Sequence, residues 1–318
     1  MTNSYNLIAV TGPTATGKTS LAAQIAKRFN GEVISADSRQ VYRRMNLGTG
    51  KDYSDYIVND IPVPVHLIDI MEPGYQYSVY EFQRDFFRVF SDLQNRGKMP
   101  VLCGGSGMYL NAVLRAYRLN EVPRNEDLRK SFRDMSLDEL SRLLSTMKSL
   151  HNITDLDTPE RAVRAIEIAT YYREHSGIPD VPRINALVLG LIYDRAVERK
   201  RITERLKNRM KQGMVEEVKN LLESGIPAEK LIYYGLEYRF ITRYLLGELD
   251  YSTMFRLLNT AIHQFAKRQR TWFRKMEREG TKVHWIPGDL TLEEKLEIVT
   301  RLLDPGQQPV TLHQSPLM

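Results

Sequence analysis

The amino-acid sequence predicts an α/β protein: a parallel-sheet core with a phosphate-binding loop (P-loop), a helical insertion domain and a mostly helical C-terminal region. Three observations support this fold class. Short apolar runs alternate with amphipathic stretches over the first 114 residues, as strands and helices do in a parallel sheet. A glycine-rich loop follows the first apolar run. After residue 120 the pattern becomes helical, apart from one strongly apolar run at 186–193.

The elements follow in chain order. Strands are expected at 6–10, 32–36, 63–70, 99–103, 186–193 and 284–286. The third is the weakest, because Pro62 and Pro64 lack the N–H that a sheet ladder needs. Helices are expected at 20–29, at 78–94 and from 108 onward; 125–176 looks wholly helical, and helices dominate again from 194 to about 278.

These elements divide the chain into four parts. They are a P-loop core at 1–114, a helical insertion at 115–185, a return to the core with basic helices at 186–303, and a tail at 304–318. The tail is expected to be disordered, because proline, glycine and polar residues dominate it.

Composition narrows the classes of protein. The chain has no run of eighteen apolar residues and its polar start lacks a signal peptide, so no membrane contact is expected. The single cysteine, Cys103, fits a reducing cytoplasm, and without an evident assembly segment we expect a monomer. The net charge is +6, with most of the excess at 191–278. Such a stretch suits a polyanion such as nucleic acid, although solvated helix faces would give the same pattern.

A P-loop motif follows the first strand. It consists of Gly12, Pro13, Thr14, Ala15, Thr16, Gly17, Lys18 and Thr19. This is the full G-x-x-x-x-G-K-[ST] pattern, and the strand before it and the helix after it make a chance match a weak alternative. The loop N–H groups and Lys18 would bind phosphate, and the Thr19 hydroxyl can hold a magnesium ion (Mg2+). A diphosphate ester would fit this loop as well as a nucleotide.

Polar residues follow the second strand. Asp37 comes directly after it, and the carboxyl ends of parallel strands form the active-site crevice of such sheets. A carboxylate there can accept a proton from an attacking nucleophile, although an aspartate that caps the next helix would occupy the same place. Ser38, Arg39 and Gln40 extend the polar cluster beyond what capping requires.

A second glycine turn, at 104–107, follows the strand at 99–103. Glycines let a ligand or another chain segment come close to the backbone, and Ser106 could donate a hydrogen bond to a substrate. Tight packing of strand against helix explains the glycines equally well.

Two basic segments lie in the C-terminal region. Residues 195–211 hold eight basic and two acidic side chains, and Arg201 and Arg205 share a helix face from which they could reach a diphosphate. Lys267, Arg268 and Arg270 precede Trp272 and Phe273. Cations interleaved with aromatic rings suit an RNA backbone and unstacked bases. Alternatively, the two aromatic rings anchor the helix in the core.

These motifs together resemble those of bacterial tRNA dimethylallyltransferases. The matching segments are GPTATGKT at 12–19, ISADSRQVYR at 34–43, VHLIDIMEPGYQYS at 65–78, VLCGGSGMYL at 101–110, PERAVRAIEI at 159–168 and AKRQRTWFR at 266–274. They follow the order of that family and cover most of the chain to about residue 275. A P-loop alone is shared by many families, whereas its combination with the segments at 37–42 and 267–274 is specific.

The resemblance implies a reaction. N6 of the adenosine next to the anticodon, position 37 of tRNAs that read codons beginning with U, attacks C1 of dimethylallyl diphosphate, and diphosphate leaves. Asp37 corresponds to the general base and Thr14–Thr19 to the diphosphate cradle, in which Lys18 and Thr19 would be catalytic. The charge of the leaving diphosphate calls for further cations, for which Arg201, Arg205 and Mg2+ are the candidates. The residues that correspond to tRNA contacts are Asp37, Ser38, Arg39, Gln40, Ser106, Arg129, Glu160, Arg161, Ala162, Val163, Arg164, Lys267, Arg268 and Arg270. The insertion at 115–185 would grip the anticodon stem.

The chain departs from the family pattern at four places. Ser106 stands where threonine is usual, and Val65-His66 where two histidines are common. Residues 48–52 read G-T-G-K-D rather than G-T-A-K-P, and residues 235–238 read G-L-E-Y rather than G-Y-K-E.

Three other functions compete with this interpretation: a small-molecule P-loop kinase, a prenyltransferase of free adenine nucleotides, and a non-catalytic RNA-binding module. The intact Lys18, Thr19 and Asp37 argue against the third.

Overall fold

The computed structural model describes residues 5–147, 156–175 and 180–304. It divides the chain into two compact units. The first consists of the described residues up to Tyr117 and from Pro182 onward, and the second of those from Arg118 to Val181. The sequence pattern predicts this insertion at 115–185.

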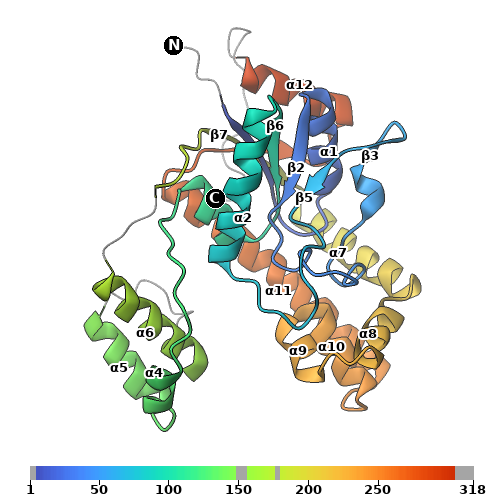
Figure 1. Ribbon diagram of the computed structural model, residues 1–318. Helices are drawn as coiled ribbons and strands as arrows, with labels where there is room; N and C mark the ends of the chain where they lie inside the picture. The colour runs from blue at the N-terminus through green and yellow to red at the C-terminus, as the bar shows by residue number, and fades with distance from the viewer. Residues whose placement is uncertain (1–4, 148–155, 176–179, 305–318) are drawn as a thin grey trace. The chain divides into compact units, whose positions relative to one another are not determined.

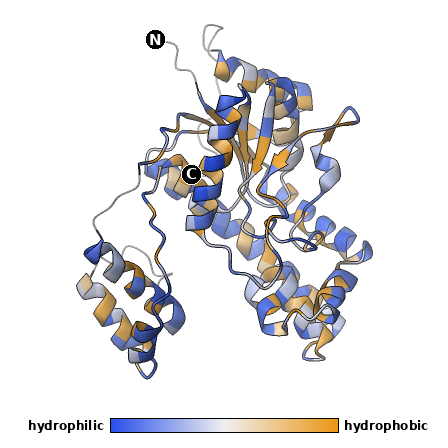
Figure 2. Cartoon of the chain, in the orientation of Figure 1, coloured by the Kyte–Doolittle hydropathy of each residue, from blue (hydrophilic) through white to orange (hydrophobic). Residues whose placement is uncertain are grey.

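The first unit is built on one parallel sheet of six strands (Figure 1), in the order β5-β2-β6-β1-β7-β8. The strands are β1 (Leu7–Thr11), β2 (Gly31–Ser35), β5 (Val65–His66), β6 (Met99–Cys103), β7 (Ala186–Ile192) and β8 (Val283–Pro287). The central strands β1 and β7 are mostly apolar and buried, and they appear largely orange in Figure 2, because both faces of the sheet are covered. The predicted fold class is confirmed.

Helices cover the two faces. Ile8 and Val10 of β1 point to one face, where they pack with α1 (Lys18–Arg28) and α12 (Leu292–Leu303). Leu7 and Ala9 point to the other, in the cluster that holds the buried side chains of α2 (Val79–Asn95), α3 (Gly107–Leu114) and α11 (Tyr251–Arg278). This alternation follows from the two-residue period of a strand.

The helices between β7 and β8 extend the second of these cores. They are α7 (Arg195–Lys211), α8 (Met214–Glu223), α9 (Ala228–Tyr234) and α10 (Leu236–Leu245), followed by α11. Smaller elements follow β2: the 3-10 helix η1 (Tyr53–Tyr56), and β3 (Ile57–Val58) paired antiparallel with β4 (Ile61–Pro62). Among the described residues, no helix has the length and apolar content that crossing a membrane requires.

The second unit contains α4 (Glu126–Ser131), α5 (Leu137–Met147) and α6 (Pro159–Glu174). Its small core is formed by Leu140 and Leu144 of α5 against Ala162, Val163 and Ile166 of α6. As predicted, the described residues within 125–176 form helices and no strand, although the chain leaves the helical conformation between Ser131 and Leu137. Ser136 begins the new helix by accepting a hydrogen bond from Glu139 N at 3.3 Å.

The predicted strands can be compared with those in the structure. β6 has the predicted bounds, and β1, β2 and β7 lie within one residue of theirs. The strand expected at 63–70 is wrong: only Val65 and His66 pair with β2. Leu67 and Asp69 have φ angles of 60° and 53°, a left-handed conformation that ends a strand. The tail expected to be disordered lies, from residue 305 onward, outside the described residues.

Candidate active site

Three loops meet at one edge of the sheet. β2, β6 and β1 are neighbours and parallel, so the segments that follow them, Asp37–Gln40, the second glycine turn and the P-loop, leave the same edge. Gly104 N donates to Val10 O at 3.1 Å, and Ala36 N donates to Cys103 O at 2.7 Å. A Cβ atom on Gly104 would lie 2.3 Å from Ala36 O, so only glycine permits this approach.

The P-loop folds around its own carbonyl groups. Gly12 and Gly17 have φ angles of 144° and 83°, and a Cβ atom on Gly12 would lie 2.4 Å from Leu191 O. Lys18 Nζ donates to Pro13 O at 2.6 Å. Lys18 also begins α1, so the positive end of that helix faces the loop. This arrangement places a lysine and a helix N-terminus where an anion-binding loop has them.

The electrostatics of the loop centre on Lys18. Burial lowers the pKa of Lys18 to about 8, and the positive charge of Arg205 acts in the same direction, while Asp37 and Glu198 act against it. A bound polyphosphate would raise this pKa again, because the anion stabilises the charged ammonium.

Asp37 is partly buried beside a turn rather than a helix. Its Oδ1 accepts from Arg39 N at 2.8 Å and, at 3.4 Å, from Gln40 N, which fixes the direction of the carboxylate. The residues that follow form turns, so the helix-cap alternative does not apply. Ser106 Oγ accepts from Ser38 N at 3.2 Å, which joins this segment to the second glycine turn.

Two other members of the polar cluster have structural partners. Gln40 is buried, accepts from Ser35 Oγ at 3.1 Å and donates to Gly50 O at 3.1 Å. The guanidinium of Arg39 lies 5.5 Å from the ring centroid of Tyr234 and 5.9 Å from that of Tyr233.

The two predicted arginines of α7 reach different partners. Arg201 Nε donates to Ala15 O of the P-loop at 2.9 Å, and its guanidinium lies 4.5 Å from the ring centroid of Tyr193. Arg205 donates to Asp52 Oδ2 at 3.1 Å. Arg201 therefore contacts the P-loop directly, whereas Arg205 is held by a carboxylate of the segment after β2.

Three residues beside Arg205 were not predicted as site residues from the sequence: Asp52, Arg209 and Glu237. Arg209 donates to the same Asp52 oxygen at 2.9 Å, and a Cβ atom on Gly50 would lie 2.6 Å from Arg205 and 2.7 Å from Arg209. Burial raises the pKa of Glu237 to about 7, while the charges of Arg209 and Arg205 lower it. Two features of the sequence could have pointed to these residues: Arg205 and Arg209 are four positions apart, and the segments at 48–52 and 235–238 differ from the family pattern.

The basic segment of α11 is split between the interior and the surface. Lys267 and Arg268 are exposed, whereas Arg270 forms an ion pair with Glu198, which is 2% exposed. Phe273 is fully buried and the Trp272 ring packs against Gly107, so both aromatic rings anchor the helix. Only part of this predicted RNA-binding segment is therefore free to meet a partner.

The second unit holds the remaining predicted tRNA contacts. Arg129 donates to Glu167 with Nε and a second nitrogen, each at 2.7 Å, and Arg164 donates to the same carboxylate at 3.1 Å. Glu160 and Arg161 are exposed at the start of α6. Ala162 and Val163, also predicted as contacts, are buried in the small core.

The donor set at the P-loop suits Mg2+ held mainly by phosphate oxygens. Thr19 supplies a hydroxyl in the first turn of α1, and no cluster of three or more His, Cys, Asp or Glu residues is found in the part of the chain that the structure describes. Mg2+ commonly needs only one or two protein ligands when substrate phosphates and water complete its octahedron. Thr19 therefore fits the ion.

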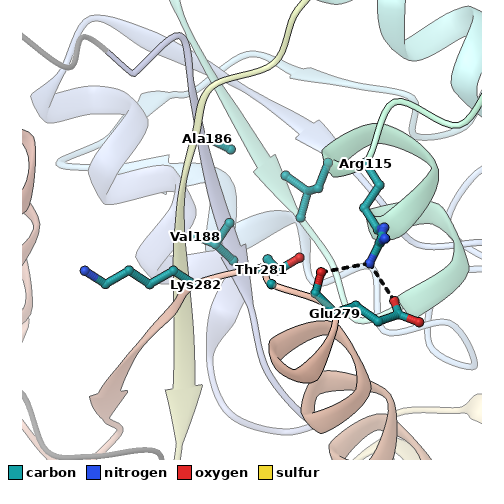
Figure 3. Close-up of a pocket in the computed structure, with 8 residues that line it drawn as sticks. Arg115, Ala186, Val188, Glu279, Thr281 and Lys282 are labelled. Carbon is teal, nitrogen blue, oxygen red and sulfur yellow. Dashed lines mark hydrogen bonds and ion pairs between the residues drawn. The ribbon is translucent and has the colours of Figure 1, made fainter.

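A separate pocket of about 430 Å³ lies at the other end of β7 (Figure 3). Ala186 and Val188 line it, and Arg115 and Glu279 form an ion pair of 2.8 Å at its wall. It contains none of the predicted site residues. The candidate active site is thus the loop edge of the sheet, with an anion cradle, one oriented carboxylate and a basic helix.

Comparison with known proteins gives consistent results. A family model described as IPP transferase matches residues 40–276, and one described as isopentenyl transferase matches residues 5–59. The chain is 55% identical to tRNA dimethylallyltransferase 2 of Phocaeicola vulgatus, over 94% of this chain and 98% of the relative. It is 53% identical to tRNA dimethylallyltransferase 1 of Parabacteroides distasonis, over 95% and 98%.

Two solved structures share the fold. The tRNA isopentenylpyrophosphate transferase from Bacillus halodurans aligns with a TM-score of 0.69 and 31% identity, covering 95% of this chain and 96% of that one. A eukaryotic dimethylallyltransferase acting on tRNA aligns with a TM-score of 0.78 over 98% of this chain and 82% of that one; at 20% identity it supports the fold alone.

The lowered pKa of Lys18 predicts how anion binding depends on pH. Below pH 8 the ammonium is charged, and Lys18→Met should weaken the affinity for inorganic pyrophosphate roughly 10- to 100-fold, the usual effect of losing a hydrogen bond to a charged group. As the pH rises through 8 to 10, Lys18 loses its proton and the ratio of the two affinities should shrink. Titration calorimetry of both proteins at each pH measures this ratio, and ionisation of pyrophosphate does not change it because both proteins bind the same ligand. A ratio that stays constant up to pH 10 would contradict the lowered pKa of Lys18.

Proposed function

The chain belongs to the IPP transferase family, and we propose that it transfers a dimethylallyl group from dimethylallyl diphosphate to N6 of the adenosine next to the anticodon (position 37) of tRNAs that read codons beginning with U, releasing diphosphate. The observation that carries this proposal is the meeting of an anion-binding P-loop and the oriented carboxylate of Asp37 at one edge of the sheet. Two curated relatives, at 53–55% identity over nearly the whole chain, are named tRNA dimethylallyltransferases.

The diphosphate of the donor would bind in the P-loop. The amides of the loop, the positive end of α1 and Lys18 supply the positive charge. Arg201 holds the carbonyl of Ala15 and would stabilise the loop around the ligand. Thr19 would hold Mg2+, which supplies charge neutralisation for the leaving diphosphate. Arg205 is close enough to lower the pKa of Lys18, and it shares Asp52 with Arg209. Its release to the diphosphate would therefore leave Arg209 to neutralise that carboxylate.

The acceptor base would approach from the side of Asp37. Its exocyclic N6 attacks C1 of the donor, the C1–O bond breaks, and the electron pair leaves with the diphosphate. Asp37 accepts the proton that N6 gives up. An adenine stacked in a loop must first be flipped out, and Arg39, Ser38 and Ser106 line the segment that would receive it.

RNA binding is assigned to two surfaces. On the first unit, Lys267 and Arg268 are the exposed cations of the α11 segment. On the second unit, Glu160 and Arg161 are exposed, whereas Arg129 and Arg164 are tied to Glu167. We propose that the second unit grips the anticodon stem, with Arg129 bracing α4 against α6 as well as meeting RNA.

The direct test supplies radiolabelled dimethylallyl diphosphate, Mg2+ and unmodified tRNA, with AMP and ADP as competing acceptors. Label in tRNA alone supports the proposal. Label in the free nucleotides alone would make the chain an adenine-nucleotide prenyltransferase. ATP turnover without any label would indicate a small-molecule kinase, and the proposal would then be wrong.

Asp37 should be required for transfer but not for RNA binding. Asp37→Asn keeps an oxygen that can accept from Arg39 N but cannot take a proton from N6, so single-turnover transfer should fall roughly 10²–10⁴-fold. The dissociation constant for tRNA should stay within about threefold of the original, because replacing a carboxylate by its uncharged amide removes no cation that could contact a phosphate. Near-normal turnover in this variant would rule out Asp37 as the general base.

The exposed cations of α11 should contribute to the salt dependence of RNA binding. Changing Lys267 and Arg268 together to alanine should lower the slope of log affinity against log salt by roughly two, about one for each lost phosphate contact. A matched control is the pair Lys27 and Arg28, also adjacent and exposed, on α1 at the opposite face of the sheet. Equal slopes in the two double variants would remove α11 from the RNA-binding surface.

A further inference from the structure

One buried side chain joins the two glycine loops of the site. Gln269 of α11 is 6% exposed. Its Oε1 accepts from Thr14 N of the P-loop at 2.9 Å, and its Nε2 donates to Gly105 O of the second glycine turn at 3.0 Å. The two loops are 91 residues apart in the chain, and Gln269 lies more than 160 residues beyond either.

Packing fixes the position of this glutamine. A Cβ atom on Gly105 would lie 2.4 Å from Gln269 Nε2 and 3.3 Å from Gly12 O, so the absence of a side chain at 105 makes the room. One turn further along, Gly107 lies against the ring of Trp272, and Arg115 pairs with Glu279. The helix α11 therefore runs along the second glycine turn and α3, which keeps the backbone of Gln269 beside the two loops.

The two contacts lead directly into the proposed chemistry. On one side, Thr14 belongs to the loop that would hold the donor diphosphate. On the other side, Gly105 precedes Ser106, which accepts from Ser38 N beside Asp37. The path from the diphosphate cradle to the carboxylate thus passes through the amide group of Gln269.

We propose that Gln269 is a positioning residue: it fixes the P-loop against the second glycine turn, and so sets the donor diphosphate relative to the base-binding segment. The inference rests on the proposed function. Glutamine suits this place because its planar amide supplies one acceptor and one donor in a fixed geometry. Glutamate would keep the acceptor for Thr14 N but bring an oxygen against Gly105 O, and methionine would keep the length and lose both hydrogen bonds.

The test compares Gln269→Met and Gln269→Glu with Gln264→Met, which makes the same change at an exposed position of the same helix. In Gln269→Met, the KM for dimethylallyl diphosphate should rise roughly tenfold, the effect of losing one or two hydrogen bonds. The KM for tRNA should change less than twofold, and the control variant should match the original protein in both. A purely structural role would lower the amount of folded protein and leave both KM values unchanged.

A second measurement does not depend on transfer activity. Hydrogen exchange at the Thr14 amide should be faster in Gln269→Met than in the original protein, and Gln269→Glu should retain most of the protection because it keeps the acceptor. Unchanged exchange together with unchanged donor KM would overturn the inference. If the original protein transfers no prenyl group, the proposed function fails, while faster exchange in the Met variant alone would still support the link between the loops.

Discussion

The site depends on close approaches to three glycines that leave no room for a side chain on any of them. Gly12 lies against Leu191, Gly104 against Ala36, and Gly105 against the amide of Gln269. Each contact would place an added Cβ atom within about 2.4 Å of another heavy atom. These steric limits, together with the parallel pairing of β2, β6 and β1, bring three loops to one edge of the sheet. Asp37, Lys18 and Ser106 are thereby brought close enough to form hydrogen bonds with the backbone of these loops.

Carboxylates neutralise part of the positive charge in the site. The stretch at 191–278 is strongly basic in sequence, yet Arg270 is neutralised by Glu198, and Arg205 and Arg209 share Asp52. Burying an arginine without such a partner would be costly, so the acids are part of what allows cations to stand beside the P-loop. The positive charge left for RNA is therefore smaller than the sequence total suggests.

Local patterns in the sequence predicted the core strands, the P-loop and the place of Asp37, because strand alternation and the G-x-x-x-x-G-K-[ST] spacing are properties of short segments. The strand at 63–70 failed because left-handed backbone at Leu67 and Asp69 leaves no mark in a hydropathy pattern. Asp52 and Gln269 were missed for another reason: each acts on residues more than ninety positions away. Such contacts exist only once the sheet has brought the loops together.

The contact between Gln269 of α11 and Gly105 of the second glycine turn also limits which substitutions this protein can accept during evolution. A side chain at position 105 would occupy the space of the Gln269 amide, and a shorter residue at 269 would leave Thr14 N and Gly105 O without partners. Neither position can drift freely while the other stays as it is. Descendants of this chain would have to alter the two together, so an alignment of its relatives should record them as a covarying pair.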